Sequence, residues 1–93
     1  MFQLSHMTWE EVADAVRSGI ETAILPIGAT EQHGPHMGCG MDTAIAHRLC
    51  SDVAAESEIF LLPTLPYGCS LGHSHRWPGT IALNPKTLID VIS

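Results

Sequence analysis

The sequence predicts an α/β fold with a mainly parallel β-sheet, formed by residues 1–93 as one domain. Two short apolar segments, residues 20–28 and 59–63, are typical of buried strands, and they flank a segment with helical periodicity, residues 42–56. Parallel strands need a crossover connection of a dozen or more residues, which is usually a helix. The order strand, helix, strand therefore predicts a right-handed βαβ unit.

The first helix is expected over residues 9–18. Thr8 and Glu11 have the spacing of a capping box, and Gly19 follows as a helix stop. Pro26 lies near the end of the first predicted strand and marks the point where regular strand pairing ends. Apolar side chains recur with a helical period at Trp9, Val12, Ala13 and Val16.

The second helix, residues 42–56, is expected to begin at Asp42 as its N-cap. After the second strand, residues 80–83 are expected to be extended. Asn84 and Pro85 then form an N-cap followed by proline at the first helical position, so a further helix is expected from residue 85 onward. It has no terminator before Ser93. The second helix carries one apolar stripe, made of Ile45, Ala46, Leu49, Cys50, Val53 and Ala54.

Composition excludes several classes of protein. The chain has 93 residues, a formal net charge of -6 and a pI of about 5.3, which is the wrong sign for binding a phosphate backbone. No apolar segment approaches the roughly 20 residues of a membrane span, and no export signal is recognisable at the N-terminus. The three cysteines are an odd number for a disulfide framework. We therefore expect a cytoplasmic protein with reduced thiols that binds neither nucleic acid nor a membrane.

Residues 31–42 contain the densest group of candidate metal ligands. Glu31 and His33 are separated by one residue, so in an extended segment their side chains point to the same side and Gln32 points to the other. Asp42 supplies a second carboxylate after a glycine-rich turn. On spacing alone, Glu31 could equally be a solvated loop charge, and Asp42 could serve only as a helix cap.

A second loop, residues 65–80, follows the second predicted strand. It is long and carries two histidines, His73 and His75, with an arginine and two aromatic residues. In open parallel sheets, ligands bind beyond the carboxyl ends of the strands, where both loops are expected to lie. A structural zinc knuckle is a weaker alternative, in which the ligands would be His33, His36, Cys39 and Cys69.

Several sequence blocks in order resemble the N-terminal part of the creatininase (creatinine amidohydrolase) family. These are residues 25–36 (Leu-Pro-Ile-Gly-Ala-Thr-Glu-Gln-His-Gly-Pro-His), Asp42, residues 67–70 (Tyr-Gly-Cys-Ser) and residues 78–80 (Pro-Gly-Thr). The resemblance implies a three-layer α/β/α fold with a mainly parallel sheet, of which this chain supplies only the N-terminal part. It also implies a homo-oligomer, a hexamer, and a metal-dependent amidohydrolase that cleaves a C–N bond.

The resemblance also implies residue roles. Glu31, His33 and Asp42 match the first metal-ligand cluster of a site for two divalent ions, zinc and/or manganese, with Asp42 as the bridge. The substrate would be a small-molecule amide, contacted by Ser70 and His73, with Trp77 as a wall of the pocket. The family's later ligands, which include an Asn-Gly-His motif, have no counterpart here, and the general acid and base stay unassigned.

The reference reaction of the family is the opening of creatinine to creatine. The family resemblance also admits deformylases and a peptidase of cofactor maturation, which are alternative functions. A different class of alternative is a catalytically incomplete fragment that acts only as a folded or partner-dependent module.

Overall fold

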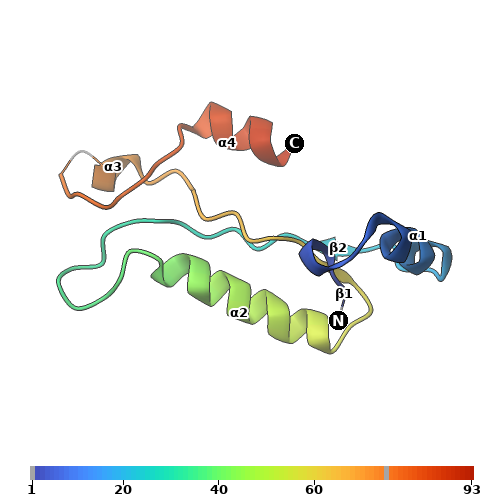
Figure 1. Ribbon diagram of the computed structural model, residues 1–93. Helices are drawn as coiled ribbons and strands as arrows, with labels where there is room; N and C mark the ends of the chain where they lie inside the picture. The colour runs from blue at the N-terminus through green and yellow to red at the C-terminus, as the bar shows by residue number, and fades with distance from the viewer. Residues whose placement is uncertain (1, 75) are drawn as a thin grey trace.

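A three-stranded parallel sheet lies at the centre of the chain. The computed structural model describes residues 2–74 and 76–93. The strands are β1 (Phe2–Gln3), β2 (Ala23–Ile24) and β3 (Phe60–Leu61), in the order β1-β3-β2. Phe60 pairs with Phe2 on one side and with Ala23 on the other. The predicted βαβ unit, with its parallel strands, is confirmed, whereas β1 was not expected from the sequence (Figure 1).

The regular strands are much shorter than predicted. β2 covers two residues of the expected segment 20–28, and β3 covers two of the segment 59–63. Pro26 has no N–H to donate, so the regular ladder cannot continue through it. Pairing resumes beyond it as an isolated parallel bridge between Ile27 and Leu65, where Gly28 N donates to Leu65 O at 2.8 Å. The two segments therefore stay side by side up to the start of the two histidine-bearing loops.

Helix α1 (Trp9–Arg17) has the predicted capping box. Glu11 N donates to Thr8 Oγ1 at 3.2 Å, and Thr8 N donates to Glu11 Oε1 at 3.1 Å. Gly19 ends the helix with φ of 109°, a conformation that favours glycine. A short 3₁₀ helix, η1 (Leu4–His6), precedes it. The core below α1 is formed by Ala15, Ile20 and Phe60, with Phe2, Leu4, Met7 and Val12 packed around them.

Helix α2 (Met41–Ala55) has its N-cap two residues earlier than expected. Its N-cap is Gly40, which has no side chain to cap with, and Asp42 lies inside the first turn. The prediction that Asp42 is the N-cap is therefore wrong. The physical reason is that its carboxylate is turned toward His33, at 3.4 Å between Oδ1 and Nε2. Ala54 is fully buried.

The predicted apolar stripe of α2 is only partly covered. Its outer members remain half-exposed or more: Ile45, Leu49 and Val53.

Two further helices complete the described chain. Helix α3 (Leu71–Ser74) lies in the second loop and was not expected, whereas α4 (Pro85–Ile92) has the predicted start. Asn84 Oδ1 accepts from Thr87 N at 2.8 Å. Residues 80–83 are extended, as expected, and they form isolated bridges that join Ile81 to Thr30 and Ala82 to Gly68. No helix in the described part of the chain is long and apolar enough to cross a membrane.

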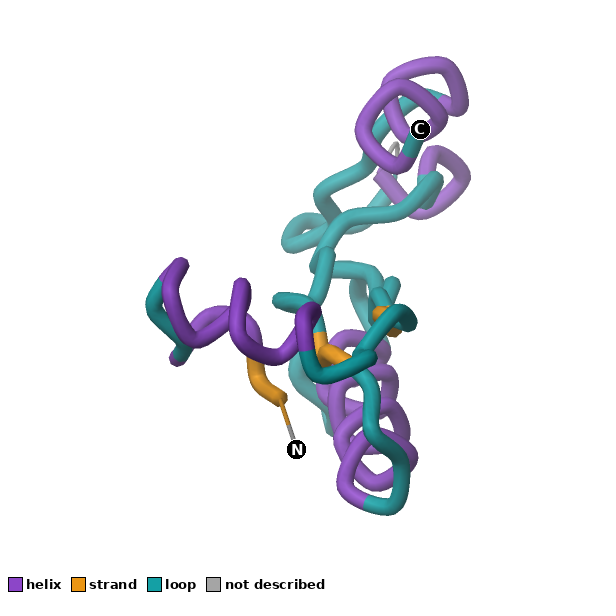
Figure 2. Tube along the Cα trace, turned by 90° about the vertical axis from the view of Figure 1, so that its right-hand side faces the viewer, coloured by secondary structure: helices purple, strands orange, loops and turns teal. Residues whose placement is uncertain are grey.

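The molecule is elongated. Its radius of gyration is 15.7 Å and its extents are 49 × 29 × 18 Å, whereas a compact chain of this length has a radius of gyration of about 12 Å. Its accessible surface of 6193 Å² likewise exceeds the roughly 5,200 Å² expected for its mass. Figure 2 shows α1, α2 and the α3–α4 part extending in different directions from the central strands. Much apolar surface therefore stays uncovered within this chain.

Candidate metal centre

The first turn of α2 packs closely against the segment that follows β2. A Cβ atom at Gly28 would lie 2.5 Å from Thr43 Cα, so only glycine allows this approach. Thr43 Oγ1 also donates a hydrogen bond of 3.0 Å to Ala29 O. Because Asp42 is the neighbour of Thr43, this packing brings its carboxylate close to residues 31–33.

A tight turn returns the chain from Glu31 to α2. Gly34 has φ of 76°, which a residue with a side chain rarely adopts. Glu31 N donates to Cys39 O at 3.1 Å and closes the turn. The turn therefore brings Glu31 and His33, at its start, close to Asp42, at its end.

Glu31, His33 and Asp42 come together as the sequence predicts. Each offers one possible ligand atom, and these atoms all lie within 4.8 Å of one another. His33 Nδ1 lies 2.9 Å from Glu31 O, which accepts its N–H and leaves Nε2 facing Asp42. A backbone carbonyl that orients an imidazole in this way is typical of metal-binding histidines. Two carboxylates and one imidazole suit zinc or manganese.

The surroundings of Glu31 favour its charged form. The Ser70 hydroxyl donates a hydrogen bond that lowers the pKa of Glu31, and contact with Asp42 and the nearby imidazoles of His73 and His33 lower it further, against an opposing effect of burial. The pKa of His33 is raised, first by its hydrogen bond to the Glu31 carbonyl and then by Asp42. The carboxylate of Glu31 is therefore ionised and ready to act as a ligand at neutral pH.

The second loop lies directly beside these three residues. Ser70 is only 7% exposed and hydrogen-bonds to Glu31. His73 lies close enough to act on the Glu31 charge, and its ring is 5.7 Å from that of Trp77, which is 42% exposed. Ser70 and His73 thus lie next to the candidate ligand Glu31, and Trp77 lies beside His73. The substrate-binding role of these three residues stays a prediction. His75 is outside the described residues.

Direct hydrogen bonds join the two loops. Thr30 Oγ1 donates to Pro66 O at 2.7 Å, and Gln32 N donates to Thr80 Oγ1 at 3.0 Å. Sequence reasoning did not find these partners, although Thr80 belongs to the Pro-Gly-Thr block that carries the family resemblance. These bonds hold the second loop against the metal-ligand segment.

The zinc-knuckle alternative gains no support. Among the residues that the structure describes, the convergent donor group is Glu31, His33 and Asp42, and it contains no cysteine. Cys39 Sγ instead packs against Gly79, where a Cβ atom would come within 2.8 Å of the sulfur. Cys69 is exposed.

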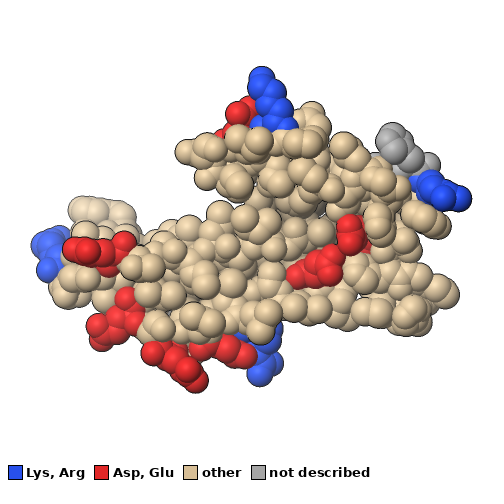
Figure 3. Space-filling view, turned by 180° about the vertical axis from the view of Figure 1, so that it is seen from behind, with Lys and Arg blue, Asp and Glu red and all other residues tan. Residues whose placement is uncertain are grey.

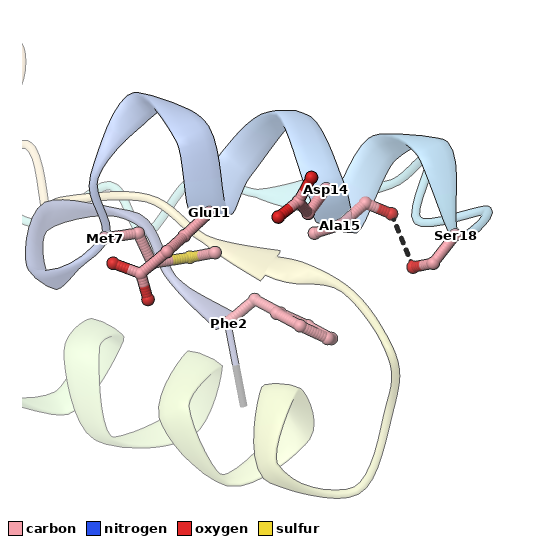
Figure 4. Close-up of a pocket in the computed structure, with 6 residues that line it drawn as sticks. All are labelled: Phe2, Met7, Glu11, Asp14, Ala15 and Ser18. Carbon is pink, nitrogen blue, oxygen red and sulfur yellow. Dashed lines mark hydrogen bonds between the residues drawn. The ribbon is translucent and has the colours of Figure 1, made fainter.

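An open groove lies elsewhere, beside α1. It has a volume of about 450 Å³, and Figure 4 shows its lining. It offers two carboxylates but no imidazole or thiol, so it is a poor match for a zinc or manganese site. The residues that line it are Phe2, Met7, Glu11, Asp14, Ala15 and Ser18.

The acidic charge is unevenly distributed. Between Glu21 and Asp52 the sequence contains only two acidic residues, Glu31 and Asp42. In Figure 3, most acidic side chains gather toward one end of the visible face, and a separate acidic patch lies further along it. Glu31 and Asp42 are thus set apart in the sequence from the acidic residues of α1 and of the end of α2.

Comparison with known proteins identifies the family of this chain. The family model described as Creatininase, creatinine amidohydrolase, matches residues 5–93. The chain belongs to the creatininase family. The creatinine amidohydrolase of Pseudomonas putida is 32% identical over 93 residues, covering 96% of this chain and 36% of the relative. The mycofactocin precursor peptide peptidase of Mycobacterium tuberculosis is 35% identical over 75 residues, covering 70% of this chain and 30% of the relative.

Solved creatininase structures show the same fold. A crystal structure of creatininase has a TM-score of 0.88 and 34% identity, over 96% of this chain and 36% of that chain. Other matching creatininase structures include a zinc–zinc form and a manganese form. This chain therefore has part of the α/β creatininase fold, and the expected resemblance to its N-terminal portion is confirmed. It spans about a third of the length of the curated relatives it matches.

Proposed function

We propose that this chain supplies part of the metal centre of a metal-dependent amidohydrolase that cleaves a C–N bond. The observation that carries the proposal is the convergence of Glu31, His33 and Asp42, from the loop that follows β2 and from the first turn of α2. The opening of a cyclic amide, with creatinine to creatine as reference reaction, is the first candidate. One of the matching creatininase structures contains creatine, which supports this choice.

In this proposal each residue of the centre has a distinct part. Glu31, His33 and Asp42 would hold the two divalent ions, zinc and/or manganese, with Asp42 shared between the ions. Such a pair of ions, when bound, supplies a water of lowered pKa and polarises the amide carbonyl.

The substrate contacts belong to the second loop. Ser70 fixes the Glu31 carboxylate through its hydroxyl and faces the same site. His73 and Trp77 form the adjoining wall, where an amide substrate can be oriented by hydrogen bonding and ring contact.

A peptidase of cofactor maturation is the second candidate from the same reaction class. It is favoured by the match to the mycofactocin precursor peptide peptidase. That protein is 35% identical to this chain, and the creatinine amidohydrolase is 32% identical. A creatininase-like deformylase, which would use the same chemistry, is the third candidate. All three need the same metal-binding residues, so the centre itself does not separate them.

A catalytically incomplete module is the candidate from a different class. It is favoured by the elongated shape and by the exposed apolar side chains, including Trp9, which is 76% exposed. Assembly into the homo-oligomer that the resemblance implies, a hexamer, would also cover such surface. A cytoplasmic location also belongs to the proposal.

The experiment that tests the proposal measures metal binding and turnover together. The chain is titrated with Zn²⁺ or Mn²⁺ by calorimetry, then incubated with creatinine or with a short peptide, and the products are followed by mass spectrometry. Conversion of creatinine to creatine supports the first candidate, and cleavage of the peptide alone supports the second. Metal binding without turnover supports the incomplete module. Absence of metal binding overturns the proposed centre.

A further inference from the structure

Gln32 makes three hydrogen bonds that the metal centre does not require. Its backbone N donates to Thr80 Oγ1 at 3.0 Å, and its side-chain Oε1 accepts from Gly34 N at 2.9 Å. Its side-chain Nε2 lies 3.3 Å from His73 Nδ1. The side chain of Gln32 therefore reaches toward the second loop.

These contacts fix which end of the amide faces the histidine. A backbone N–H can only donate, so the atom of Gln32 that meets Gly34 N must be the oxygen. The amide nitrogen then faces His73, and because it is a donor, His73 Nδ1 has to accept. In a neutral imidazole with an accepting Nδ1, the hydrogen is on Nε2.

The position of His73 makes its tautomer relevant to the site. The ring lies at 5.7 Å from the Trp77 ring and close enough to Glu31 to influence its charge. The hydrogen on Nε2 is on the opposite side of the ring from Gln32. An N–H at this position can donate to a carbonyl oxygen of a bound amide.

We propose that Gln32 is a positioning residue that holds His73 as the neutral tautomer with its hydrogen on Nε2, ready to donate a hydrogen bond to the substrate. The identity of the acceptor rests on the proposed function, whereas the tautomer rests only on Gly34, Gln32 and His73. The simpler role for Gln32 is a mechanical tether between the loops, which it also provides through Thr80.

The test reads the tautomer directly by long-range ¹H–¹⁵N NMR of the full chain, without added metal and at a pH where His73 is neutral. The His73 signals are identified by their loss in His73→Gln. We expect an unprotonated nitrogen at Nδ1 and a protonated one at Nε2. In Gln32→Glu the side chain offers no N–H, so the hydrogen moves to Nδ1 and the two signals exchange character.

Two further variants separate positioning from tethering. Thr80→Val removes the other cross-loop hydrogen bond of Gln32 and should leave the tautomer unchanged. Gln32→Leu removes the donor without adding charge and should give a mixture of tautomers. A protonated Nδ1 in the unsubstituted chain overturns the proposal, as does an unchanged tautomer in both Gln32 variants. A chain that binds no Zn²⁺ but has the expected tautomer overturns the proposed function and leaves this inference standing.

Discussion

Replacing Asp42 with alanine should separate metal binding from folding. The structure excludes Asp42 as the N-cap of α2, so its contribution to helix stability is that of a carboxylate in the first turn, no more than about 1 kcal/mol. Its contribution to the metal centre is far larger, because it is one of three convergent donors. Loss of a residue that only orients a ligand weakens metal binding about 10–100-fold, so loss of a ligand should cost more than about 100-fold.

The assay compares calorimetric titration with Zn²⁺ and urea unfolding of the metal-free protein. Asp52→Ala is the matched control, because Asp52 is on the same helix and is ion-paired with Arg48 at 3.2 Å, away from the candidate centre. We expect the control to retain metal affinity and both variants to retain nearly full stability. Unchanged Zn²⁺ affinity in Asp42→Ala, or a loss of several kcal/mol in its unfolding free energy, would refute the reasoning.

Three further outcomes are expected. Gly28→Ala should lower the unfolding free energy by about 3 kcal/mol through overpacking, whereas Gly38→Ala, where the added Cβ has open space, should change it by less than about 0.5 kcal/mol in urea unfolding. Ser70→Ala should raise the pKa of Glu31 toward its ordinary value, because the largest cause of its lowering is removed, and NMR titration of the carboxyl carbon measures this; an unmoved pKa contradicts the assigned hydrogen bond. As the pH is lowered, Zn²⁺ affinity should begin to fall at a higher pH than it would for a site with an ordinary histidine. The reason is that the raised pKa of His33 lets protons compete with the metal earlier. Without metal, the stability of the fold has the opposite pH dependence. The charged His33 stabilises the fold at low pH, and this contribution is lost as the pH rises through its raised pKa.

The parts of the site that sequence reasoning found are those set by local geometry. Glu31 and His33 share one side of an extended segment, and Asp42 returns to them through a short glycine-containing turn. Alternation and turn chemistry are visible in a single sequence. The role of Asp42 was harder to predict, because the same short carboxylate can cap a helix or face a ligand site. The packing of Thr43 against Gly28 decides between these two roles.

The parts that sequence reasoning missed depend on contacts between distant segments. Gln32 and His73 are 41 residues apart along the chain. Their contact requires the second loop to form the short helix α3, whose sequence shows no helical periodicity. Strand lengths were overestimated because an apolar run shows burial on a sheet but not how many of its residues find a paired neighbour. β1 was missed because two residues, Phe2 and Gln3, carry no detectable alternation.

The central place of β3 in the sheet has a consequence for synthesis on the ribosome. Phe2 can pair only after Phe60 has been made, because β1 has no other strand as its neighbour in the described sheet. At about 5–20 residues per second, roughly 3 to 12 s separate the translation of these two residues. During that interval the nascent N-terminus, with the apolar side of α1, has no sheet to cover it, so the apolar surface of this segment stays exposed until β3 is made.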